Sequence, residues 1–219
     1  MLLTAVKLAG LVLTAACCWL ASRTTNLALI WGAPILTIPV AALGRHALDA
    51  AASKKRAEWA DVIVHYAMMM ALGAGIFPAV KLVRDAPGLA ILFPRALGFA
   101  LFVITGAITA LTVLNLAIRG LGAPFAAKLS SRLATDWMYA WTRNPMLLAT
   151  LLWFFSMGLW RQSVWFVVWM AVSVAPGWIA FIKIYEEREL ELRFGPGYLE
   201  YKARTPFLWP RRPMTRRRP

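Results

Sequence analysis

The residues best suited to chemistry surround the segment that starts at Arg143. Asn144 is a residue type that caps helices, and Pro145 is favoured at the first helical position. The backbone N–H groups of Met146 and Leu147 would then lack intrahelical acceptors and point out of the helix start. With Arg143 beside them, these groups can bind a carboxylate or a phosphate. The alternative that these residues leave open is an ordinary capped helix start with an arginine at a membrane interface.

A pair of carboxylates follows farther along the chain. Glu186 and Glu187 come directly after an apolar segment, 164–184, which a short polar turn joins to another, 146–160. Two helices joined so closely run antiparallel, so the pair returns to the membrane level of Arg143. Carboxylates and a helix N-terminus are therefore predicted to converge at one face of the membrane.

The remainder of this charged segment is expected to be a short helix. Glu189 and Arg193 are spaced to pair along it, and Glu189 and Glu191 are expected on its solvated face. Gly195 suits the position just after a helix end, and Pro196 cannot continue the same helix.

Membrane helices are the elements that must position these residues. Of the 219 residues 60% are apolar, against about 45–50% in soluble domains. Backbone groups in lipid must be paired within their own segment, so the apolar segments are helices. The sequence predicts an all-α fold, a polytopic membrane helical bundle with five to six transmembrane helices and a C-terminal helical cap. The six apolar segments are 2–20, 27–43, 62–80, 96–118, 146–160 and 164–184.

Two of these segments have special features. The segment 146–160 covers only about 22 Å, less than the hydrocarbon thickness of about 30 Å, which explains the range of five to six. The first segment has no clear cleavage site for a signal peptide and is expected to be retained.

Lysine and arginine content predicts the orientation. An even number of crossings puts both termini on one side of the membrane. All but five of the 24 Lys and Arg residues lie on that side, mainly in the loops 44–61 and 119–143 and from Lys183 onward. Because cytoplasmic loops are rich in Lys and Arg, both termini, the helical cap and the active site are predicted to be cytoplasmic.

The net charge of +14 does not indicate a nucleic-acid partner. The charges lie between apolar segments, and no length remains for a folded basic domain. The basic tail, 211–219, instead indicates contact with anionic lipids. The chain is expected to divide into transmembrane helices (1–130), the polar motifs around the hairpin (131–210) and this tail.

Cysteine and histidine provide no metal site. Cys17 and Cys18 are adjacent within an apolar segment, and His46 and His65 are far apart in the sequence. This pattern predicts neither a zinc site nor a disulfide framework. His65 is expected to be a hydrogen-bonded residue within the bundle.

Two motifs resemble a known group of enzymes. YAWTRNPM, followed by the hairpin and then by EE and FGPGYLEYKARTP, is similar to the integral-membrane methyltransferases of the isoprenylcysteine carboxyl methyltransferase and phospholipid methyltransferase superfamily. The chain departs from the family pattern at Trp137, where the family has Gly, at Leu147, where it has Tyr, and at Ser131, where His is common. The matching residues are Tyr139, Arg143, Asn144 and Pro145, then Glu186, Glu187, Leu190, Phe194, Gly195, Tyr198, Tyr201, Arg204 and Pro206.

The resemblance implies an S-adenosyl-L-methionine-dependent methyltransferase that acts on a lipid or lipid-linked acceptor. The acceptor is left open between an isoprenylcysteine-like carboxylate, a phospholipid amine and a small hydrophobic molecule. Methyl transfer is a direct displacement, so no catalytic nucleophile is assigned, and catalysis would come from positioning and from water exclusion. The resemblance also implies that residues 131–210 hold the cofactor-binding motifs and that the helices of 1–130 give the acceptor access. The cofactor-binding residues implied are Tyr139, Arg143, Asn144, Pro145, Met146, Leu147, Glu186 and Glu187.

Two other functions stay open from the sequence. A membrane NADPH-dependent reductase would need a second arginine cluster for phosphate, which Arg211 and Arg212 could supply. A non-catalytic protein that retains the fold is the other, with Trp137 and Leu147 as signs of a lost pocket. Trp137 is expected to turn outward to the membrane interface, where Trp is common, although it could instead fill part of the pocket.

Overall fold

The structure, a computed structural model, describes residues 2–50, 54–119 and 133–212. This part of the chain is helical throughout, apart from turns and one isolated β-bridge, which confirms the predicted fold class. The helices are α1 (Leu2–Ala21), α2 (Leu27–Ile35), α3 (Thr37–Ala50), α4 (Lys54–Asp85), α5 (Arg95–Arg119), α6 (Met138–Trp141), α7 (Pro145–Trp160), α8 (Val164–Trp169), α9 (Ala175–Phe181), α10 (Glu187–Phe194) and α11 (Pro196–Arg204).

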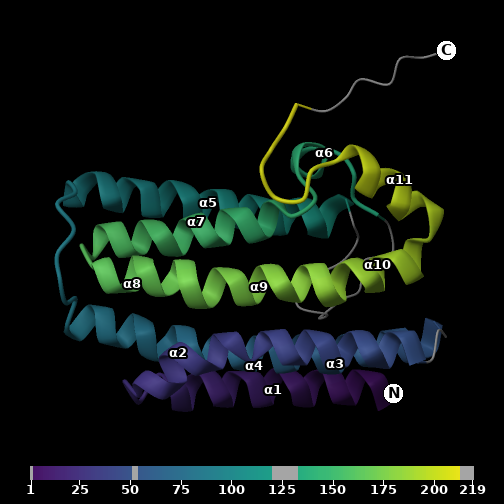
Figure 1. The fold of residues 1–219 in the computed structure, drawn as a ribbon, viewed down its shortest axis with the longest axis horizontal. Helices are drawn as coiled ribbons and strands as arrows, with labels where there is room; N and C mark the ends of the chain where they lie inside the picture. Colours follow the sequence, from purple (N-terminus) through teal and green to yellow (C-terminus); the bar gives the residue numbers. More distant parts are fainter. Residues whose placement is uncertain (1, 51–53, 120–132, 213–219) are drawn as a thin grey trace.

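The long helices run along one axis as an elongated bundle (Figure 1). On one side α5 packs along α7, and on the other α1, α2 and α3 pack against α4. Between them runs a continuous helical rod in which α8, α9 and α10 are joined by two π-helical turns, η1 (Met170–Val174) and η2 (Ile182–Glu186). The apolar core lies where this rod meets α3, α4 and α7.

Five helical stretches in the described part of the chain are long and apolar enough to cross a membrane, and α7 is a shorter apolar helix. These counts fit the predicted five to six crossings. One boundary prediction was wrong: the expected loop 44–61 is largely helical, because α3 continues to Ala50 and α4 begins at Lys54. A change to polar residues marks the membrane boundary, but it does not end a helix whose hydrogen-bond ladder can continue.

The rod also extends beyond its predicted end. The predicted segment 164–184 stops at the membrane boundary, whereas the rod continues through η2 and α10 to Phe194. Gly195 ends it with a φ of 53°, a left-handed conformation that glycine adopts readily, as expected for this position. The charged residues after Ile184 therefore lie on a rigid helix, and the chain reverses into α11 only after them.

At the end of the bundle away from α10, mostly uncharged groups join the loops, and the Arg161 guanidinium adds a hydrogen bond to the carbonyl of Arg84 at 2.9 Å. The segment 86–94 packs against the turn between α7 and α8. Ser163 Oγ donates a hydrogen bond to the carbonyl of Pro87 at 2.6 Å, and Gln162 Nε2 donates one to the carbonyl of Phe93 at 3.0 Å. We call this the neutral end, and the opposite end, which carries α10 and α11, the charged end.

Candidate functional site

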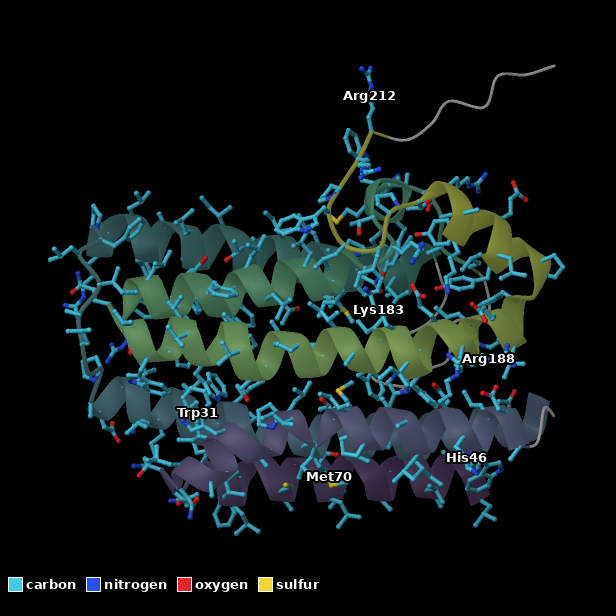
Figure 2. The ribbon with its side chains drawn as sticks, viewed as in Figure 1. Trp31, His46, Met70, Lys183, Arg188 and Arg212 are labelled. Atoms are coloured by element: carbon cyan, nitrogen blue, oxygen red, sulfur yellow. The ribbon has the colours of Figure 1, made fainter. Side chains whose placement is uncertain are left out.

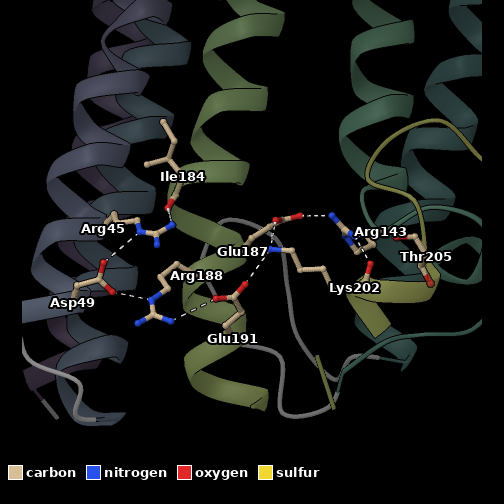
Figure 3. Close-up of polar contacts among 9 residues, drawn as sticks. All are labelled: Arg45, Asp49, Arg143, Ile184, Glu187, Arg188, Glu191, Lys202 and Thr205. Atoms are coloured by element: carbon tan, nitrogen blue, oxygen red, sulfur yellow. Dashed lines mark hydrogen bonds and ion pairs between the residues drawn. The ribbon is translucent and has the colours of Figure 1, made fainter. Parts of the chain in front are cut away.

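Arg143 is the centre of a polar network at the charged end (Figure 3). Its Nη2 donates to Glu187 Oε1 at 2.6 Å, and both side chains are largely buried. Its Nη1 donates to the carbonyl oxygens of Lys202 at 2.7 Å and Thr205 at 2.9 Å. Arg143 therefore holds α10 and the end of α11 against the start of α7, and its Nε is buried without a hydrogen-bond partner among the described residues.

Lys202 is the second cation of this network. Its Nζ lies 2.7 Å from Glu187 Oε2 and 3.0 Å from Glu191 Oε1. Burial opposes the charge, but the two carboxylates outweigh it and raise the pKa of Lys202. Lys202 was not predicted, because it occupies a variable position between the fixed tyrosines and arginine of the second motif.

The network continues outward to α3. Glu191 also pairs with Arg188, and Arg188 Nε lies 2.7 Å from Asp49 Oδ1. Asp49 in turn pairs with Arg45, whose Nη1 donates to the carbonyl of Ile184. These outer pairs are partly exposed, so each contributes little by itself, but together they connect the two halves of the bundle at this end.

The start of α7 has the predicted position and a different cap. Pro145 is its first residue and Asn144 precedes it, but the Asn144 side chain does not cap the helix. Its Nδ2 donates instead to the carbonyl of Phe207 at 2.9 Å, because the C-terminal segment folds back along this turn. Among the described residues, no acceptor contacts the N–H groups of Met146 and Leu147. The helix start thus keeps its capacity for an anion, and the predicted side-chain cap is wrong.

Two side chains near this start have different roles. Leu147, where the family has Tyr, is buried in the apolar core with Leu151, so only its backbone N–H is available to a ligand. Asn115 of α5 is 2% exposed, and neither polar atom of its side chain has a hydrogen-bond partner among the described residues.

The packing of α5 on α7 places Asn115 near the helix start. The two helices run antiparallel, since Gly98 meets Trp160 and Thr105 Oγ1 lies 3.4 Å from Ser156 Oγ. Along α5, Asn115 follows Thr105 by ten residues, and along α7, Met146 precedes Ser156 by ten residues. Because the helices are antiparallel, Asn115 and Met146 therefore lie at the same level of the bundle. A buried carboxamide without a partner is costly and indicates a group that a ligand would satisfy. No motif in the sequence marked Asn115.

Tyrosines form the aromatic part of the site. Tyr201 Oη donates to the carbonyl of Tyr139 at 2.7 Å and so fixes α6 on α11. Burial and the nearby Glu186 raise the pKa of Tyr139. Burial raises the pKa of Tyr198 and Tyr201 as well, so all three phenols are neutral at physiological pH.

Trp137 has its side chain outward, with 61% exposed. Its φ is 52° and its ψ is −122°, a conformation that is strained for any residue with a Cβ. The family pattern has Gly at this position, and the backbone geometry supplies the physical reason. The expectation that Trp137 turns outward agrees with this exposure.

The two neighbouring glutamates face different surroundings. Glu187 binds Arg143 and Lys202, whereas Glu186 interacts electrostatically with Asp61 and His65 of α4 and with Tyr139 of α6. The structure thus brings Glu187 to Arg143, as predicted, and directs Glu186 toward α4, because successive helical residues point about 100° apart.

Two expectations about α4 and α10 have clear outcomes. His65 is hydrogen-bonded within the bundle, as expected, with Nδ1 3.0 Å from Asp61 Oδ1. Glu189 was expected on a solvated face, which is wrong: it is 3% exposed and pairs with Arg193, whose Nε lies 2.9 Å from Glu189 Oε1. The i,i+4 spacing predicted this ion pair, but not that the helix would turn the pair toward α4.

The region that carries α5, α7 and Glu186 is similar to a known family. Residues 93–197 match the phospholipid methyltransferase family. The match confirms the similarity that the motifs predicted, and with the candidate spans it indicates a membrane methyltransferase that acts on lipid. The matched phospholipid methyltransferase segment, just under half of the chain, excludes Asp61, His65 and Lys202. No curated protein and no solved structure matches the chain.

Proposed function

We propose that this protein is an S-adenosyl-L-methionine-dependent methyltransferase of the membrane, acting on a lipid or lipid-linked acceptor. The phospholipid methyltransferase match over 93–197 carries the proposal, because that segment contains the open start of α7, Arg143 and both glutamates. When bound, the cofactor supplies an electrophilic methyl group on a sulfonium.

The residues at this site fit the cofactor. The N–H groups of Met146 and Leu147 and the unpartnered Nε of Arg143 suit its carboxylate. The carboxamide of Asn115 can donate to or accept from a polar group at the same level. Tyr139 offers an aromatic face for the adenine or the sulfonium cation.

The network around Arg143 would keep this site in shape. Glu187 and Lys202 fix the guanidinium, and Asn144 holds the C-terminal segment over the start of α7. Phe207 adds cover, since the Arg143 guanidinium lies 5.8 Å and the Lys183 ammonium 4.8 Å from its ring centre. Such a cover would exclude water and align donor and acceptor, which is what a direct displacement needs.

Calorimetric titration of S-adenosyl-L-methionine into the purified chain in lipid nanodiscs tests the proposal. The Asn115→Leu variant is the sharpest comparison, because the Asn115 side chain has no hydrogen-bond partner among the described residues that its loss would leave unpaired. Losing one hydrogen bond should weaken binding by about tenfold while thermal stability stays the same or rises.

Thr109→Val on the same helix is the matched control, since within the described part of the chain its hydroxyl bonds to the carbonyl of Thr105 alone. It should bind the cofactor as the wild type does. A wild-type chain that binds no S-adenosyl-L-methionine would contradict the proposed function, and unchanged binding in Asn115→Leu would remove Asn115 from the site.

The orientation is part of the same proposal. The start of α7, α10 and α11 lie at the end of the bundle where α1 begins and where most Lys and Arg residues lie (Figure 1). We propose that this end is cytoplasmic, which would put the site and both termini there. The basic tail would then contact anionic lipid; Arg211 and Arg212 are exposed, and 213–219 lie outside the described residues.

The reductase alternative has no support from the arginine pair. Figure 2 shows Arg212 directed away from the bundle, and the side chains of Arg211 and Arg212 are both exposed. A titration of NADPH beside S-adenosyl-L-methionine separates the two enzymes, and binding of neither would favour a non-catalytic protein.

A further inference from the structure

A buried polar cluster lies between α4 and the rod, beside the Arg143 network but separate from it. We call it the acidic cluster, and its members are Asp61, His65, Tyr185, Glu186, Glu189 and Arg193. Asp61 is 2% exposed and anchors His65, whose ring lies edge-on to that of Tyr185 with 6.0 Å between centres. Two of these residues, Asp61 and His65, come from α4, outside the family match.

The charge of this cluster is unbalanced. Three carboxylates face one arginine and one histidine, and Arg193 is already paired with Glu189. The charged groups on the neighbouring α3, Arg45 and Asp49, are paired with each other on the partly exposed outer side. Buried carboxylates near a membrane are expensive unless a cation joins them, so the cluster is suited to a positively charged group.

Tyr185 gives independent evidence that a ligand belongs here. Its side chain is 0% exposed, and its hydroxyl has no hydrogen-bond partner among the described residues. The hydroxyl interacts electrostatically with Asp61, Glu186 and Glu189 and so faces the cluster. The ring is held in place by a close approach to α3, where a Cβ on Gly44 would come within 2.7 Å of it. A hydroxyl buried in this way is costly until a partner binds.

Glu186 connects this cluster to the site of methyl transfer. It is the carboxylate that stays partly exposed, while Asp61, Glu187 and Glu189 are buried. It interacts with His65 on one side and with Tyr139 on the other. A group bound between Glu186 and Tyr185 would therefore lie next to the proposed cofactor site.

We propose that the acidic cluster binds the protonated amine of the acceptor and takes up its proton, with Glu186 as the proton-accepting group. The proposal rests on the proposed function. In the step, one N–H bond of the ammonium breaks and its proton passes to Glu186. The freed lone pair forms a bond to the methyl carbon, the carbon–sulfur bond breaks, and its electrons stay on sulfur. A carboxylate acceptor has no proton to lose and would not need this cluster.

The test uses the full chain in nanodiscs, with dioctanoyl phosphatidylethanolamine as the amine probe and dioctanoyl phosphatidylglycerol as the control lipid. Calorimetry in two buffers of different ionisation enthalpy measures affinity and counts protons. We expect binding of the amine lipid only. Asp61→Asn and Tyr185→Phe should each weaken it at least tenfold, with S-adenosyl-L-methionine binding unchanged.

The variants are chosen to keep the fold. Tyr185→Phe removes only an unpartnered hydroxyl, so a purely structural role predicts equal or higher stability and unchanged lipid affinity. Asp49→Asn, a carboxylate of the same end outside the cluster, is the control and should behave as the wild type.

Turnover supplies a further readout. Glu186→Gln should slow methylation of the amine lipid at least tenfold near pH 7 and recover toward pH 10, where a free amine loses its own proton. Wild-type affinity and turnover in Asp61→Asn and Tyr185→Phe would overturn the inference. So would a wild type that binds S-adenosyl-L-methionine but no amine lipid, or that methylates a farnesylated thiopropionate carboxylate in preference. A chain that binds the amine lipid but no S-adenosyl-L-methionine would instead contradict the proposed function and support the amine site.

Discussion

The two ends of the bundle are closed by different forces. At the neutral end, Ser163 and Gln162 tie the segment 86–94 to a helix turn through uncharged hydrogen bonds. At the charged end, Arg143 and Glu187 form a largely buried ion pair, which the partly exposed Lys202 joins. At both ends a connecting segment is held against the helices. Because uncharged hydrogen bonds do this at the neutral end, attachment of a connecting segment does not by itself require buried charge.

The difference indicates where function lies. Buried ion pairs often add no stability over an apolar replacement, because desolvation offsets their attraction. Uncharged hydrogen bonds close the neutral end without that penalty. The largely buried Arg143–Glu187 pair, and the Asn115 and Tyr185 side chains, which have no hydrogen-bond partner among the described residues, support the proposal that the charged end binds a ligand.

The largest expected effect comes from breaking the ionic network in its middle. Glu187→Ala would leave the largely buried Arg143 without its carboxylate and would remove one partner of the partly exposed Lys202, which should cost about 3 kcal/mol of stability. Thermal unfolding in detergent and proteolysis of the α10–α11 region measure the loss. Asp49→Asn, in the exposed outer pairs, is the control and should change stability too little to resolve. Equal effects of the two substitutions would mean that burial does not distinguish the inner network from the outer one.

A smaller effect is expected at the neutral end. Ser163 is fully buried, donates to the carbonyl of Pro87 and caps α8 by accepting from the N–H of Phe166. Ser163→Ala should therefore cost about 1–2 kcal/mol. Cofactor affinity, measured on the same preparation, should stay at the wild-type value. A parallel fall in affinity would show that the two ends are coupled, so that ligand binding would not depend on the charged end alone.

The smallest effect concerns two non-glycine residues with positive φ in the described part of the chain, one at each end: Trp137, with a φ of 52°, and Gln162, with a φ of 54°. Trp137→Gly should raise stability by about 1 kcal/mol, because glycine removes the strain of an outward side chain. Gln162→Gly is the matched variant and should be nearly neutral, since relief of strain is offset by the lost hydrogen bond to Phe93. Apparent melting temperatures of both variants decide the point. A destabilised Trp137→Gly would show that the indole contributes more than its backbone costs.

The sequence by itself determined the class of protein and most of its helices. Apolar length gives the spans, Pro145 gives the start of α7, and Gly195 gives the end of α10, because each of these signals is local. The two motifs gave the methyltransferase similarity for the same reason, since fixed spacing is visible without a fold. The motifs also predicted correctly that Arg143 and Glu187 lie close together, because the second arm of a helical hairpin ends beside the start of the first.

Tertiary structure alone decided which groups meet across helices. Contact between Glu186 and the Asp61–His65 pair depends on how α4 and the rod are rotated and shifted against each other. The level of Asn115 depends in the same way on the register of α5 and α7. Packing also buries Glu189 and gives Trp137 its positive φ. It brings the carbonyl of Phe207 to the side chain of Asn144, which donates a hydrogen bond to it. Residue spacing carries no information about rotation or register between helices, because both are set by side-chain packing over the whole interface.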